Sequence, residues 1–127
     1  MCIRDRAWVQ RNIKSSFTHE HTHPNSIVSG VFYFRNDKHA GISFNKAVID
    51  RIMLPRVKNH RLNSDSWHFE PESGELILFP SSTRHSVPPN VKEDSRYCIS
   101  FNSFCFDELG VKSLSTHLNI KENDGPR

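Results

Sequence analysis

Residues 96–102 have the sequence Arg-Tyr-Cys-Ile-Ser-Phe-Asn, in which polar and apolar side chains alternate. In an extended strand this alternation places the polar side chains on one face and the apolar ones on the other. The stretch therefore predicts a β-strand with one polar face inside a β protein. Arg96 on an inward face needs a partner, and its rigid fork of donors suits a buried carboxylate. An internal Asp or Glu would serve equally well as that partner.

Short apolar or alternating runs recur along the chain, separated by Gly, Pro, Asn, Asp and Ser. None of them sustains a helical period, and a single helical turn is expected at residues 106–109. Many short strands without alternating helices favour an all-β sandwich, jelly roll or barrel. The strands are predicted at residues 7–13, 26–34, 41–44, 67–69, 76–79, 85–87 and 96–104.

The chain has 127 residues, enough for one domain. We predict a single β domain over residues 7–120. Residues 1–6 match the neighbouring sequence poorly and are expected to be a scar or a disordered end, and residues 121–127 a disordered tail. Residues 48–66 are polar and basic without a clear period, which suggests a long excursion over the mouth of the barrel. This segment is either a solvated loop or the place where an acidic or peptide substrate is recognised.

Charge, cysteines and hydropathy exclude several classes of protein. The 17 Lys and Arg exceed the 14 Asp and Glu by 3, and this small basic excess is not interleaved with a stacking platform, which argues against nucleic-acid binding. Cys2, Cys98 and Cys105 form no CxxC pair, which argues against a disulfide framework. No run approaches the roughly 18 apolar residues of a membrane span. We expect a cytoplasmic protein without a membrane partner, and exposed edge strands leave a homodimer open.

A histidine row lies at residues 19–25, His-Glu-His-Thr-His-Pro-Asn. In an extended chain His19, His21 and His23 point to one face, about 6 to 7 Å apart from one to the next. Neighbouring members of such a row can bind one Fe, Zn, Cu or Ni ion if the fold brings a third ligand from elsewhere. Asn25 is a further candidate, through its amide oxygen. The alternative is a surface histidine row without a metal.

A candidate for the third ligand is His85. It follows an apolar strand that stops at Pro80 and a polar turn, so a buried strand would deliver it at the edge of the core. The alternative is a histidine satisfied by hydrogen bonds at a strand end. The upstream pair favours the metal role, because that pair needs a ligand from elsewhere.

These motifs together resemble one known family. They are His-Thr-His-Pro-Asn-Ser at residues 21–26, Val-Ser-Gly-Val-Phe-Tyr-Phe at 28–34, Gly-Glu-Leu-Ile-Leu-Phe-Pro-Ser at 74–81, His85, and the stretch at 96–102. In order and spacing they resemble a family of 2-oxoglutarate- and Fe(II)-dependent oxygenases met in phages and marine bacteria, over residues 8–102. The resemblance implies a double-stranded β-helix, the cupin-like jelly roll of prolyl hydroxylases, which agrees with the independent β prediction.

The resemblance also implies roles for individual residues. His21, His23 and His85 stand at the positions that bind iron. His23 replaces the usual carboxylate of that site, so the ligand set is neutral and could favour Zn or Ni over iron.

The co-substrate positions are implied in the same way. Arg96 stands where the family binds the distal carboxylate of 2-oxoglutarate, and Tyr33 stands where related hydroxylases have a tyrosine that shares this carboxylate. Cys98 stands where the family tends to have serine, and a thiol is a weaker hydrogen-bond donor, so affinity for 2-oxoglutarate would be reduced.

The implied activity is that of a dioxygenase. It would couple the oxidative decarboxylation of 2-oxoglutarate by O2 to the hydroxylation of an unknown substrate, a peptide or a metabolite, with ascorbate as a further cofactor. Two alternatives stay open: a cupin-type metalloenzyme that uses the same histidines without 2-oxoglutarate, and a non-catalytic β-domain that acts as a binding module.

Overall fold

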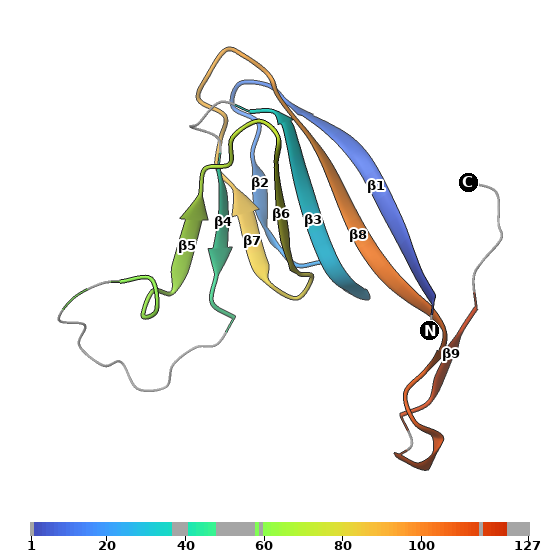
Figure 1. Cartoon of the computed structure of the whole chain (residues 1–127). Helices are drawn as coiled ribbons and strands as arrows, with labels where there is room; N and C mark the ends of the chain where they lie inside the picture. Colours follow the sequence, from blue (N-terminus) through green and yellow to red (C-terminus); the bar gives the residue numbers. More distant parts are fainter. Residues whose placement is uncertain (1, 37–40, 48–57, 59, 115, 122–127) are drawn as a thin grey trace.

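A computed structural model describes residues 2–36, 41–47, 58, 60–114 and 116–121. Nearly all regular structure in these ranges is β (Figure 1). The strands are β1 (Cys2–Asn12), β2 (Thr18–His21), β3 (Ser26–Arg35), β4 (Ile42–Asn45), β5 (Ser66–Phe69), β6 (Glu75–Pro80), β7 (Arg84–Val87), β8 (Arg96–Leu109) and β9 (Leu118–Ile120), and a 3-10 turn, η1, covers Lys112–Leu114. No helix in the described part of the chain is long and apolar enough to cross a membrane.

The first eight strands form two antiparallel sheets that face each other (Figure 1). One sheet has the order β1-β8-β3-β6, with β9 paired to the far end of β8, and the other has the order β2-β7-β4-β5. Each sheet thus interleaves strands from the two halves of the chain. This winding is the double-stranded β-helix, or jelly roll, so the predicted fold class is confirmed.

The chain ends differ most from the sequence-based expectation. Residues 2–6, expected to be a scar or a disordered end, form the first half of β1, because every residue from Cys2 to Asn12 has a partner on β8. The helical turn expected at residues 106–109 is wrong. These residues extend β8, since β1 pairs with it up to Phe106 and β9 pairs with it from Asp107 to Leu109.

Two other expectations fall largely beyond the described residues. Most of the excursion at 48–66, namely residues 48–57 and 59, lies outside them, as does the tail from residue 122 onward.

The space between the sheets has an apolar part and a polar part. Ile42, Phe44 and Phe79 form the buried apolar cluster, and the rings of Phe44 and Phe79 meet edge to face at 4.9 Å. The polar part is the inner face of β8, where the four alternating polar residues predicted from the sequence are all buried: Arg96, Cys98, Ser100 and Asn102. The jelly roll therefore holds a row of buried polar groups beside its core.

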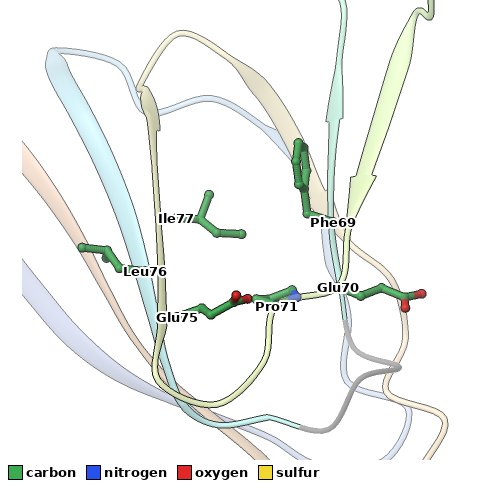
Figure 2. A pocket seen from close by; sticks show the side chains of 6 residues that line it. All are labelled: Phe69, Glu70, Pro71, Glu75, Leu76 and Ile77. Carbon is green, nitrogen blue, oxygen red and sulfur yellow. The ribbon is translucent and has the colours of Figure 1, made fainter. Parts of the chain in front are cut away.

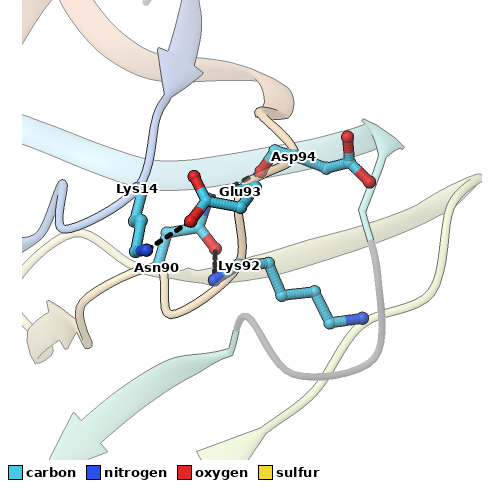
Figure 3. Close-up of polar contacts among 5 residues, drawn as sticks. All are labelled: Lys14, Asn90, Lys92, Glu93 and Asp94. Carbon is cyan, nitrogen blue, oxygen red and sulfur yellow. Dashed lines mark hydrogen bonds and ion pairs between the residues drawn. The ribbon is translucent and has the colours of Figure 1, made fainter.

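Asn90 joins two loops at one end of the roll (Figure 3). Its main-chain N–H donates to the carbonyl oxygen of Ser16 at 3.0 Å, and its side-chain amide donates to the carbonyl oxygen of Asn12 at 3.1 Å. Beside it, Lys14 forms an ion pair with Glu93. These contacts hold the end of β1 against the connection that leads into β8.

Gly41, immediately before β4, has no room for a side chain. A Cβ there would lie 2.3 Å from the main-chain oxygen of Phe69, on the paired strand β5. Backbone cannot swing aside, so we expect Gly41→Ala to lower the free energy of unfolding by about 1–3 kcal/mol in urea titrations. Gly30→Ala is the comparison: its Cβ would meet the ends of the Phe101 and Leu78 side chains, which can turn outward. A loss at Gly41 no larger than that at Gly30 would contradict this explanation.

Candidate metal centre

Three histidines converge at one end of the roll. His21 is the last residue of β2, His23 comes next in the turn, and His85 lies in β7 directly opposite His21 in the strand register. One ligand atom from each lies within 4.8 Å of those of the other two. The fold thus brings together the three residues that the resemblance assigned to iron, at a spacing that a single metal ion can span.

Hydrogen bonds orient two of these rings. Nδ1 of His21 lies 2.8 Å from the carbonyl oxygen of His19, and Nδ1 of His85 lies 2.9 Å from that of Thr83. A carbonyl only accepts, so both Nδ1 atoms carry the proton and donate it. Nε2 of each ring therefore presents a lone pair, as a metal ligand must.

Burial and mutual repulsion lower the pKa of two of the three rings, those of His23 and His85. Burial, followed by the nearby His85 and His21, lowers the pKa of His23 from 6.5 to about 4. Burial also lowers the pKa of His85, although its hydrogen bond to Thr83 opposes the shift. Neutral imidazoles are the form that binds metals, so these shifts favour metal binding by His23 and His85 at neutral pH.

This shift predicts how the metal-free protein responds to acid. The pKa of His23 is lower in the folded protein than the ordinary 6.5, so the unfolded chain takes up a proton first as the pH falls. The contribution of His23 to stability is constant above pH 6.5, and stability should fall between pH 6.5 and 4. Thermal midpoints across this range should decline less steeply in His23→Gln, and an identical slope would contradict the assignment.

Two other candidates of the row take different positions. The pairing of β2 shifts register between Thr18 and His21, and the His19 ring packs edge-on against Phe17 at 4.7 Å, outside the cluster of three. Asn25 is exposed and has a φ of 66°, a left-handed conformation that asparagine tolerates better than most residues. Its place in the turn before β3 accounts for its residue type.

Arg96 is a buried charge without a partner among the residues that the structure describes. Only 4% of the residue is exposed, and all three guanidinium nitrogens are buried with no hydrogen-bond acceptor in the described part of the chain. Burial lowers its pKa, while the neighbouring Tyr33 and Cys98 act in the opposite direction. Since an unpaired buried charge is costly, this site calls for an anion that the described chain does not supply.

The predicted neighbours of Arg96 lie around it. Tyr33 is 3% exposed and pairs with Cys98 across β3 and β8. Burial raises the pKa of Tyr33 and that of Cys98, so both keep their protons at neutral pH. The three candidate co-substrate residues thus share one buried face.

The sequence did not indicate Gln10, which lies on β1 opposite Cys98. Its Oε1 accepts hydrogen bonds from Ser100 Oγ at 3.0 Å and from Cys98 Sγ at 3.4 Å. Gln10 thereby completes the polar wall of the interior. The alternation of residues 7–13 alone does not reveal this role of Gln10. It depends on the register between β1 and β8, which places Gln10 opposite Cys98.

A separate pocket of about 320 Å³ opens where β5 runs into β6 (Figure 2). Phe69 and Ile77 face it, and the Glu75 carboxylate beside it accepts the main-chain N–H of Glu72 at 2.8 Å. It is lined by Phe69, Glu70, Pro71, Glu75, Leu76 and Ile77. None of these belongs to the three histidines or to the buried face around Arg96, so this pocket is distinct from the histidine cluster.

Fold and site together are those of a jelly-roll protein with a candidate three-histidine metal centre and a buried arginine that needs an anion. The family model described as "Putative 2OG-Fe(II) oxygenase" matches residues 6–102, well over half of the chain. The chain belongs to this family, which confirms the resemblance noted from its motifs. The family implies iron(II), 2-oxoglutarate and O2. No curated protein matches the chain.

Proposed function

We propose that the protein is a 2-oxoglutarate- and Fe(II)-dependent hydroxylase. The observation that carries the proposal is the buried Arg96 guanidinium, which has no acceptor among the described residues and lies in the same jelly roll as the three histidines. An enzyme that used the histidines alone would have no need of this charge. A dicarboxylic co-substrate that binds the metal at one end would bring a second carboxylate for the arginine to bind.

The residues of the site fit both an iron ion and 2-oxoglutarate. Imidazole nitrogens are suitable ligands for iron, and His21, His23 and His85 would hold it. The planar fork of Arg96 would bind the distal carboxylate through two parallel hydrogen bonds. When bound, iron and 2-oxoglutarate supply the oxidising chemistry, in which O2 converts the keto acid to succinate and CO2 and a C–H bond of the substrate becomes C–OH.

The residues around the site bind and orient. Tyr33 keeps its proton and can donate it to the same carboxylate as Arg96, and Cys98 is a weaker donor beside them. Fixing the co-substrate at its far end sets the direction of its reacting end. The rings of Phe44 and Phe79 lie 6.1 and 4.7 Å from that of His85 and exclude water from its inner side.

For the substrate we propose only a class, namely a peptide or a metabolite that presents a C–H bond to the metal. Ascorbate would be the reductant that maintains iron(II). A homodimer stays a prediction.

The test is spectroscopic and chemical. Untagged protein mixed anaerobically with Fe(II) and 2-oxoglutarate should develop a weak visible charge-transfer band, and admission of O2 should release succinate. Protein with Fe(II) alone is the control and should show no band. Tight metal binding without the band or succinate would refute the hydroxylase and favour a metalloenzyme of another kind.

A further inference from the structure

His23 differs from the other two histidines in what its Nδ1 contacts. Its Nδ1 lies 3.3 Å from the amide nitrogen Nδ2 of Asn102, whereas His21 and His85 use main-chain carbonyls. An amide side chain can turn either its oxygen or its NH2 group toward the ring, and the two orientations have the same shape. The tautomer of His23 therefore depends on what fixes the Asn102 amide.

Three serine hydroxyls lead away from that amide in a chain. Ser29 Oγ lies 2.7 Å from Oδ1 of the Asn102 amide and 2.7 Å from Ser81 Oγ. Ser81 Oγ lies 2.7 Å from Ser26 Oγ, which ends the chain at two main-chain carbonyl oxygens, 3.1 and 3.2 Å away. Asn102, Ser29 and Ser81 are buried, so these groups must satisfy one another.

Each hydroxyl has one proton to donate, which gives the chain a direction. The carbonyls only accept, so Ser26 donates to them and accepts from Ser81. Ser81 has then used its proton and accepts from Ser29, which in turn accepts from Asn102. The opposite direction would press the Ser26 oxygen against two carbonyl oxygens with no proton between them. This direction requires the Asn102 amide to be turned by 180° from the orientation just described, which leaves its shape unchanged: its NH2 group then faces Ser29 and its oxygen faces His23.

We propose that Asn102, oriented by this serine chain, is a positioning residue that holds the proton of His23 on Nδ1 and leaves Nε2 free for the metal. The inference rests on the proposed metal role of His23. All three histidines then have the same tautomer, which main-chain carbonyls fix in His21 and His85 and the Asn102 amide fixes in His23. The main-chain N–H of His23 also donates to the carbonyl oxygen of Ser81 at 2.9 Å, so the chain that orients the ring also fixes its backbone.

The tautomer is measurable in the metal-free wild-type protein from the 15N chemical shifts of the imidazole nitrogens at neutral pH. His23→Gln identifies the signals of His23 by their loss. We expect Nδ1 to be protonated and Nε2 to be unprotonated. A His23 ring protonated on Nε2 would overturn the proposal.

Two variants test the chain itself. Ser29→Ala removes the hydroxyl that accepts from Asn102, so the amide can turn; Nε2-protonated His23 should then appear, and the Kd for Co(II) should rise about 10- to 100-fold. Asn102→Asp should also retain the proton on Nδ1, because a carboxylate only accepts; since it cannot donate to Ser29, it should lower the thermal midpoint. Unchanged tautomer and affinity in folded Ser29→Ala would refute the role of the chain. If Ser29→Ala does not fold, the tautomer of His23 in the wild-type protein alone supports or refutes the proposal.

Ser43→Ala is the matched control, since it removes a serine hydroxyl that contacts Nδ1 of a different histidine, His68, at 2.9 Å. It should leave the His23 signals and the Co(II) affinity unchanged. The result of the tautomer measurement can be distinguished from the result of the hydroxylase test. The expected tautomer in a protein that releases no succinate would refute the hydroxylase and support the orientation of His23 by Asn102.

Discussion

Replacing Arg96 with methionine should weaken 2-oxoglutarate binding at least about 30-fold, because losing one side of a buried charge pair costs roughly 2–5 kcal/mol. The same change should raise the thermal midpoint of the ligand-free protein, since it removes a buried charge that has no partner among the described residues. Calorimetric titration of the metal-loaded protein and a melting curve of the ligand-free protein measure the two effects. Their opposite signs distinguish a binding residue from a structural one.

Arg84→Met is the control for this experiment. Arg84 is half-exposed and forms an ion pair with Glu20, and such surface pairs contribute about 1 kcal/mol or less. It should leave 2-oxoglutarate affinity unchanged. If Arg96→Met melted at a lower temperature than the wild type and still bound 2-oxoglutarate, Arg96 would belong to the core and not to a ligand site.

The substitution His85→Gln should weaken metal binding by at least about 100-fold. Changing a residue that merely supports a ligand already costs about 10- to 100-fold, and His85 would be a ligand itself. Glutamine keeps much of the volume of the ring, which packs beside those of Phe44 and Phe79. Titration with Co(II), followed by its visible spectrum, measures the loss.

His68→Gln provides the comparison, because His68 is an exposed histidine that contacts Ser43 and lies outside the cluster of three. It should bind Co(II) as the wild type does. Equal affinity in the His85 and His68 variants would show that the three-histidine cluster is not where the metal binds.

The sequence predicted those strands whose residue pattern depends only on neighbouring positions in the chain. The alternation at residues 96–102 depends only on neighbouring residues, and its polar face is buried as expected. β2 was missed because Thr18–His21 contains no apolar residue; it is a strand because β7 pairs with it. The end of β8 was taken for a helical turn for the same reason, since its strand character comes from pairing with β1 and β9.

The candidate site divides in a similar way. His21 and His23 are neighbours in sequence, and their spacing alone suggested a shared ion. The contacts of Ser29 with Ser81 and Asn102 join residues 52 and 73 positions apart, so no local pattern contains them. The pairing of β3 with β8 on one side and with β6 on the other makes them neighbours.

The unpartnered charge of Arg96 has a consequence for the amount of protein in a cell. A ligand that binds only the folded state stabilises it by mass action, and the effect grows with the logarithm of ligand concentration. If 2-oxoglutarate neutralises Arg96, the unfolded fraction exposed to proteases rises when the keto acid is scarce. The abundance of the protein would then depend on the supply of a central carbon metabolite. The link would be Arg96, whose buried charge lowers the stability of the ligand-free protein.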